Sequence, residues 1–327
     1  MYRFCQGEAL LTPKEITACR ASLGALQWLA VQTQPLICAR CNLLITELAG
    51  SPKMSAAREI QEMIRELRKH STVLKFFKLS RVQTWKDVCV VGLGDQAHNN
   101  RPKGVSTGGM LIFLACPEIA LGKANPLVFV AWKSWKLKRV AISANDAEVQ
   151  ALVETEDAVY RTRLLLAELN GAGVRSAGRE LLTGSINEVR MVPGLLGTDS
   201  RGGYDSIILN ESPLLGLSNA RAALQAEYLK QALPACGTLL VWLASDWNLS
   251  DALAKKKKEC RQSLEYFPKH RRWMLKFDPA FMISSRKQKA VSGSPAQQWQ
   301  QQVMSSEGFL YPCNSCDFIP CMFDLHR

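Results

Sequence analysis

The spacing of apolar residues divides the sequence into a helical first part and a longer part in which strands and helices alternate. In the first part, Ile60, Met63, Ile64 and Leu67 recur every three or four residues among charged neighbours, which is typical of one helix face. Capping residues and prolines separate this helix from earlier ones. The helices predicted in the first part cover residues 12–31, 36–48 and 54–69.

Short apolar runs, typical of strands, replace this spacing from Val73 onward. They are VLKFFKL, DVCVVGLG, STGGMLIFLA and LVFVAWKS. Consecutive strands before the long helix that opens at Ser143 indicate an antiparallel start to a mixed sheet. Later strands are predicted near 189–196 and from Gly237, and later helices over 217–233 and 249–258. The order βββαβαβα predicts an α/β fold with a mixed sheet, preceded by a small helical module.

The start of the long helix contains a first candidate functional residue, Glu148. A strand-like segment over 140–142 precedes it, and Ser143 and Asp146 have the spacing of a capping box, which fixes the start of the helix. A glutamate in the first turns of a helix is usually a surface partner of the helix dipole. A functional role for Glu148 therefore depends on residues elsewhere in the chain.

Composition and charge restrict the partners and the compartment. The chain has 327 residues, and its 41 lysines and arginines against 29 acidic residues favour a polyanionic partner such as nucleic acid. Residues 1–15 lack the layout of a signal peptide, and no apolar run approaches the roughly 20 residues of a membrane span. We expect a protein that is cytoplasmic or nuclear, not secreted, with no membrane partner. The lysines over 255–258 suit either a nuclear-localisation signal or the negative end of a helix dipole.

Two groups of cysteines each contain a CxxC, which occurs in metal and redox sites. Cys38 and Cys41 form a CxxC inside a predicted helix, without a second pair nearby, which favours burial over metal or redox chemistry. The second group comprises Cys313, Cys316, Cys321 and His326. Its spacing matches no common zinc finger, so a zinc site and an accidental cluster remain alternatives. A Ser- and Gln-rich run begins at residue 284 and predicts a disordered tail over 284–327.

Four acidic residues lie at element boundaries in the second part. Asp95 and Asp199 each follow a predicted strand, Glu148 lies in the long helix, and Asp251 opens a late helix. Each alone is compatible with a cap or a surface acid. Four convergent carboxylates are what two Mg²⁺ ions about 4 Å apart require, one to activate a water and one to stabilise the leaving oxygen. The set therefore predicts two-metal phosphodiester hydrolysis, with Mn²⁺ as an alternative ion.

The sequence around these acids resembles the ribonuclease H domain of copia-type retrotransposon Pol polyproteins. WKSWKLKRVAISANDAEVQAL is similar to the family block W-x-S-x-K-x-x-x-V-x-x-S-S-x-x-A-E, which places Glu148 at the catalytic glutamate. STGG is similar to the STSG turn of the family, with Asp95 upstream at the first catalytic aspartate. TDS, which contains Asp199, looks like the TDS or DAK segment of the family, and WLASDWNLSDALAKK resembles WVPTxxQLADxLTK, which places Asp251 at the fourth acid. LNESPLLGLSNARAAL and WMLKFDPAF are most similar to the divergent copia elements of dinoflagellate genomes.

The helical first part resembles the same parent protein. ACRASLGALQWLAVQTQPLICARCNLL is similar to YRSLLGALQYLAxxTRPDIxxAVNLL, the segment just after the reverse-transcriptase palm. The resemblance implies a reverse-transcriptase remnant over 1–80 and a ribonuclease H-like domain over 81–283, with the rest of a retroelement polyprotein as a partner. The polymerase signature, a tyrosine with paired aspartates, is absent, so polymerase activity is not expected.

The resemblance leads to two functional hypotheses. The first is a ribonuclease that cuts the RNA strand of an RNA–DNA hybrid. The hybrid backbone would contact a basic segment, whose alternative role is an amphipathic strand with solvated lysines. This segment comprises Trp132, Lys133, Trp135, Lys136, Lys138 and Arg139. The second hypothesis is a catalytically decayed remnant that binds nucleic acid, because Gln96, His98 and Ala254 depart from the family pattern. A reacting group misplaced by about 1 Å can cost about a hundredfold in rate.

Overall fold

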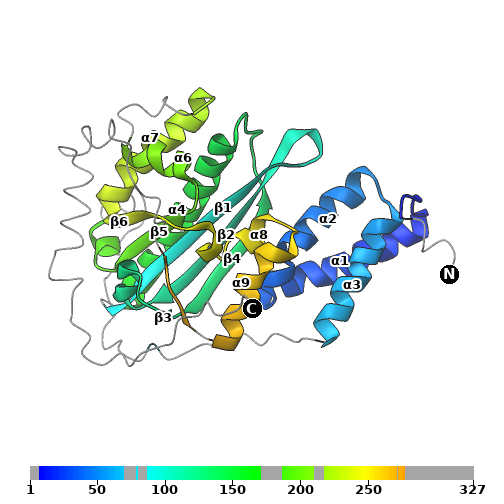
Figure 1. The fold of residues 1–327 in the computed structure, drawn as a ribbon, viewed down its shortest axis with the longest axis horizontal. Helices are drawn as coiled ribbons and strands as arrows, with labels where there is room; N and C mark the ends of the chain where they lie inside the picture. Colours follow the sequence, from blue (N-terminus) through cyan, green and yellow to red (C-terminus); the bar gives the residue numbers. More distant parts are fainter. Residues whose placement is uncertain are drawn as a thin grey trace, which may run out of the picture.

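A five-stranded mixed sheet forms the centre of the molecule (Figure 1). The computed structural model describes residues 7–69, 79, 87–170, 186–209, 217–270 and 272–276. The strands lie in the order β4, β2, β1, β5, β6 and span Val128–Lys136, Val105–Ala115, Cys89–Arg101, Gly194–Thr198 and Thr238–Trp242. β2 is antiparallel to β1 and β4, whereas β1, β5 and β6 run parallel. This topology confirms the α/β prediction and the ribonuclease H-like fold.

One face of the sheet is covered by α4 (Ala144–Leu169) and α7 (Ala220–Cys236). Val90 of β1 and Ile112 of β2 are buried on this face together with small residues of α4. The helix lies very close to β1, since a Cβ atom on Gly94 would be 2.8 Å from Thr155 Oγ1. Between β5 and α7 lie the short helix α6 (Arg201–Tyr204) and the π-helix η6 (Asp205–Leu209).

The opposite face of the sheet carries the short helix that follows β6, and the last helix and the N-terminal helices pack around it, one of them against β4 (Figure 1). These helices are α1 (Pro13–Gln32), α2 (Cys38–Gly50), α3 (Met54–Lys69), α8 (Asp251–Ala254) and α9 (Lys258–His270). Leu44 and Met63 belong to the same apolar cluster as Leu93 of β1, and Trp132 Nε1 donates a 2.7 Å hydrogen bond to Ala30 O. The predicted domain boundary near residue 80 stays a prediction. The helical module and the sheet share one hydrophobic core.

Several short elements complete the described chain. The 3₁₀-helices are η2 (Pro35–Ile37), η4 (Pro102–Gly104), η5 (Pro117–Leu121) and η7 (Ser245–Trp247), and β3 (Asn125–Pro126) pairs with β7 (Arg272–Trp273). No helix in the described ranges is long and apolar enough to cross a membrane. The zinc candidates, the tail over 284–327 and the strand predicted from Val73, except Leu79, lie outside the described residues.

The helix starts agree closely with the prediction. α3 spans 54–69 as expected, and the start of α4 is capped reciprocally: Ser143 Oγ accepts from Asp146 N at 3.2 Å, and Asp146 Oδ2 accepts from Ser143 N at 3.1 Å. Cys38 and Cys41 are buried in α2, as predicted. Burial raises the pKa of these thiols to about 11 and about 12, so they are protonated at neutral pH.

Other boundaries were predicted wrongly. β1 runs on through Asp95 to Arg101 because β2 continues the ladder beside it, with Asp95 opposite Gly109. The STGG segment lies inside β2, as the strand-like run STGGMLIFLA predicts, and is not the turn that the family resemblance implies. The segment over 140–142 is not a strand, and Val140 and Ile142 are exposed.

Two later segments also differ from the prediction. Residues 186–190 are helical, and β5 begins only at Gly194. The helix expected over 249–258 is interrupted, since α8 ends at Ala254 and α9 begins at Lys258. The lysine cluster therefore lies between two helices, with Lys255 at the C-terminal end of α8 and Lys258 at the start of α9. Its first two members, Lys255 and Lys256, instead pair with acidic residues.

Candidate active site

Three aspartates meet beside the end of β5. Leu93 of β1 is in register with Gly197 of β5, so Asp95 and Asp199, each two residues further along, lie side by side where β5 ends and β1 continues. Asp251, the first residue of α8, joins them. Carboxylate oxygens of Asp95, Asp199 and Asp251 all lie within 4.8 Å of one another.

Asp251 reaches this position because α8 lies directly on β2. A Cβ atom on Gly109 would be 2.7 Å from the backbone nitrogen of Ala254, so only a glycine leaves room for the helix. Gly109 is the residue paired with Asp95 across the hairpin. The close approach of helix and strand thus places Asp251 beside Asp95.

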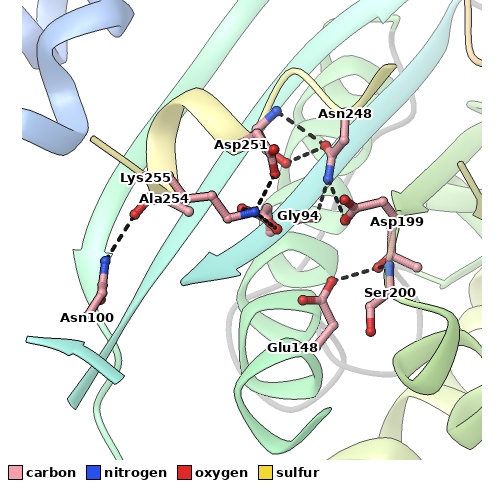
Figure 2. Close-up of polar contacts among 12 residues, drawn as sticks. Gly94, Asn100, Glu148, Asp199, Ser200, Asn248, Asp251, Ala254 and Lys255 are labelled. Atoms are coloured by element: carbon pink, nitrogen blue, oxygen red, sulfur yellow. Dashed lines mark hydrogen bonds and ion pairs between the residues drawn. The ribbon is translucent and has the colours of Figure 1, made fainter. Parts of the chain in front are cut away.

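Glu148 lies next to the aspartates and is buried, with 2% of its surface exposed. Thr198 Oγ1 donates a 2.6 Å hydrogen bond to Glu148 Oε1 and accepts one of 3.0 Å from Ser200 N (Figure 2). A Cβ atom on Gly203 would be 2.9 Å from Glu148 Cγ, so a glycine is needed beside the glutamate. Glu148 is therefore a buried carboxylate fixed by a hydrogen bond, and it is not a surface partner of the helix dipole.

Asn248 orients Asp199 and was not singled out from the sequence. Its Nδ2 atom donates to Asp199 Oδ1 at 3.0 Å and to Gly94 O at 3.3 Å, and its Oδ1 atom accepts from Ser250 Oγ at 2.6 Å. In Figure 2 the amide lies between Asp199 and Asp251. The available signal was the position of Asn248 inside WLASDWNLSDALAKK.

Lys255 is the second site residue that sequence reasoning missed. Its ammonium lies 2.8 Å from Asp251 Oδ1 and 3.2 Å from Asp95 Oδ2, as Figure 2 shows for the side chain pointing back from the end of α8. Lys255 therefore supplies a positive charge inside the carboxylate cluster.

The carboxylates perturb one another strongly. Burial, followed by the charge of Asp251, raises the pKa of Asp95 well above its usual value and also raises that of Asp199. Burial and then Asp199 raise the pKa of Glu148 to about 8. Burial alone would lower the pKa of Lys255, but the nearby carboxylates outweigh it and raise the pKa. The ionised carboxylates of the cluster are therefore stabilised by a nearby cation.

The residues of this cluster suit a hard divalent cation. Carboxylate oxygens are the ligands that Mg²⁺ and Mn²⁺ prefer in proteins. Asp95 Oδ2 is buried and accepts no hydrogen bond within the described part of the chain, although the Lys255 ammonium is near. Such an ion can be held by Asp95, Asp199 and Asp251. Glu148 lies beside them and can serve as a further ligand.

The basic segment on β4 and beyond differs in part from expectation. Trp135 is 7% exposed, because its ring packs on Gly108, where a Cβ atom would be 2.6 Å from Trp135 Cζ2. Its ring is therefore not available to stack on a base. Lys133 and Lys138 lie 3.7 Å and 2.7 Å from Glu154, which leaves them partly neutralised. Of the other members, Trp132 contacts the helical module, and Lys136 and Arg139 are exposed.

Arg139 borders a shallow groove between the beginnings of α4 and α7. The groove has a volume of about 430 Å³. It is lined by Arg139, Val153, Arg221, Leu224, Gln225 and Tyr228. Two arginines together with exposed apolar side chains, Leu224 and Tyr228, suit a polyanion that also has flat apolar groups.

Comparisons with known proteins add little to this geometry. No protein-family model and no curated protein matches the sequence. Among solved structures, a foamy viral protease-reverse transcriptase in complex with RNA/DNA hybrid is similar over 55% of this chain and 21% of its own, with 17% identity and a TM-score of 0.29. The native prototype foamy virus protease-reverse transcriptase is similar over 59% and 21%, with 11% identity and a TM-score of 0.26. The chain thus spans about a fifth of these proteins. Scores this low do not establish a shared family or activity.

Proposed function

We propose that this chain is a metal-dependent ribonuclease derived from a retroelement Pol polyprotein, cutting the RNA strand of RNA–DNA hybrids. The observation that carries the proposal is the convergence of Asp95, Asp199 and Asp251 within 4.8 Å beside the end of β5, with buried Glu148 next to them. The copia-type origin is supported by the motifs that contain these acids.

Each residue has a separate task in the proposed reaction. Two bound Mg²⁺ ions would supply an activated water and charge stabilisation at the leaving oxygen. Asn248 orients the Asp199 carboxylate through its 3.0 Å bond, and Thr198 holds Glu148 through its 2.6 Å bond. Such fixed orientation keeps charges in place for the transition state without reorganisation.

The groove between α4 and α7 is a proposed nucleic-acid contact. Arg139 lies just before α4, and Arg221 lies in the first turn of α7. Neither arginine forms an ion pair within the described ranges. Phosphate contacts of this kind supply sequence-independent affinity and a dependence on salt. Changing both arginines to serine should weaken hybrid binding and flatten its salt dependence.

The decisive experiment is cleavage of a labelled RNA–DNA hybrid in Mg²⁺ or Mn²⁺, with single-stranded RNA and duplex DNA as controls. Asp95→Asn and Glu148→Gln should abolish cleavage without weakening hybrid binding in EDTA. Asp157→Asn, an exposed acid on the same helix as Glu148, is the matched control and should cleave normally. Full cleavage by Asp95→Asn would refute the proposed site.

A catalytically inactive nucleic-acid-binding remnant is the second candidate. The observation in its favour is Lys255, whose ammonium bonds Asp251 and approaches Asp95 and so neutralises part of the cluster without a metal. Hybrid binding by the wild type without cleavage in either metal ion would favour this candidate.

A further inference from the structure

The segment that carries Asp251 is tied to the N-terminal helices by an ion pair. Lys256, two residues beyond the end of α8, places its ammonium 2.7 Å from Glu47 Oε1 of α2 and 3.1 Å from Glu59 Oε2 of α3. Its side chain is 29% exposed. A contact to two helices at once restrains Lys256 in more than one direction.

The acidic partners are themselves held in place. Glu59 also accepts from Arg40 Nε at 3.3 Å, and Arg40 is buried in α2. Arg40 in turn donates to Glu66 Oε2 at 2.6 Å, which joins α2 to α3 a second time. Lys256 therefore binds carboxylates on two helices that are themselves joined by Arg40.

A second set of bonds reaches α8 from the β1–β2 hairpin. Asn100 Nδ2 donates to Ala254 O at 3.4 Å, and Thr107 Oγ1 donates to Asn100 Oδ1 at 2.8 Å. Arg101 donates to Thr107 Oγ1 at 2.8 Å and to Thr46 Oγ1 of α2 at 2.6 Å. Both routes from α8 thus end on α2.

α8 needs such support because it is a helix of four residues. Isolated helices shorter than about 12 residues are marginal in water, so contacts with neighbours must determine its position. Ala252, Leu253 and Ala254 are fully buried, and the first two belong to the core that α1 to α3 share with the sheet. A short non-helical link connects α8 to α9, and Lys256 makes its contact from this link.

We propose that the contact of Lys256 with Glu47 and Glu59 is a positioning device for Asp251, which makes α2 and α3 working parts of the metal site. The inference rests on the proposed function, because it concerns the metal that Asp251 would bind. Without this contact, the end of α8 gains freedom and the Asp251 carboxylate moves away from Asp95 and Asp199.

A positioning role differs measurably from a merely stabilising one. Partly exposed ion pairs contribute little to global stability, whereas removal of a group that orients a metal ligand typically costs about 10- to 100-fold in metal affinity. Loss of Lys256 should therefore change metal binding much more than it changes the melting temperature.

The test uses the full chain and measures Mn²⁺ binding by calorimetry, melting temperature in EDTA, and the Mg²⁺ concentration that half-saturates cleavage. Lys256→Met should raise the metal Kd and the half-saturating Mg²⁺ concentration about tenfold, with hybrid affinity in EDTA unchanged. Lys256→Arg should restore most of the loss. Lys257→Met, which removes the neighbouring exposed lysine, should behave as the wild type.

Two results would overturn the inference. If Lys256→Met lowers the melting temperature but leaves the metal Kd unchanged, the ion pair is structural only. If Lys257→Met weakens metal binding as much as Lys256→Met, the effect is one of general charge. The proposed function fails separately, and this inference with it, if the wild type shows no metal binding that Asp251→Asn removes.

Discussion

Glu148→Gln removes a carboxylate that is hard to ionise in the folded chain while keeping an oxygen for the Thr198 hydroxyl. Burial and then Asp199 raise the pKa of Glu148 from 4.5 to about 8, whereas the unfolded chain ionises this group near 4.5. Between these pH values the folded state binds more protons than the unfolded state, so the free energy of unfolding falls as the pH rises. The glutamine variant escapes this loss.

The magnitude is set by the separation of the pKa values. From 4.5 to about 8, at roughly 1.4 kcal/mol for each tenfold change in acidity, the loss has a ceiling of about 5 kcal/mol. The part of this loss that comes from repulsion by Asp199 depends on whether Asp199 is ionised. We therefore expect Glu148→Gln to be more stable than the wild type by about 2 to 5 kcal/mol above pH 8, and nearly equal to it in stability below pH 5.

Urea unfolding in EDTA at about pH 5 and about pH 8.5 measures this difference. Glu168→Gln, which changes an exposed glutamate near the end of the same helix, is the control and should show no such pH dependence. Mg²⁺ should recover much of the stability of the wild type at the higher pH, because a bound cation favours the ionised carboxylates. A glutamine variant that is no more stable than the wild type at the higher pH would refute the reasoning.

Three further substitutions test other parts of the argument. Gly109→Ala should lower kcat of cleavage about a hundredfold, because the new methyl group would lie 2.7 Å from Ala254 N and must displace α8. Lys255→Met should lower the melting temperature in EDTA and enlarge the rise caused by Mg²⁺ in a thermal-shift assay, because the carboxylates lose their internal cation. Arg163→Met should cost about 3 kcal/mol or more in urea unfolding, because it deprives buried acceptors of their donor, whereas the exposed Arg161→Met should cost little.

The parts of the fold that depend on residues close together in the sequence were predictable. The capping pair of Ser143 and Asp146 fixes the start of α4 within a few residues, and the apolar stripe of α3 is visible in its spacing alone. The order of strands and helices was read in the same way. The motifs also grouped Asp95 with Asp199, and the parallel pairing of β1 with β5 brings the two residues side by side.

The parts that depend on distant residues were not predictable. β1 runs past Asp95 because β2 continues to pair with it, which no property of β1 itself reveals. The basic segment around Trp135 predicts a surface aromatic, yet Gly108 on the adjacent strand opens a place for its ring. The packing of α1 to α3 on the sheet likewise depends on which apolar faces meet.

The aspartates show the same division within the candidate site. Spacing and motif were enough to select Asp95, Asp199 and Asp251, because residue type and position along a strand or helix are local properties. The tertiary structure decided what surrounds them: Asn248 beside Asp199, and Lys255 beside Asp95, 160 positions apart in the chain. Hydrogen bonds and charges act through short distances in space, and only folding brings these groups within that range.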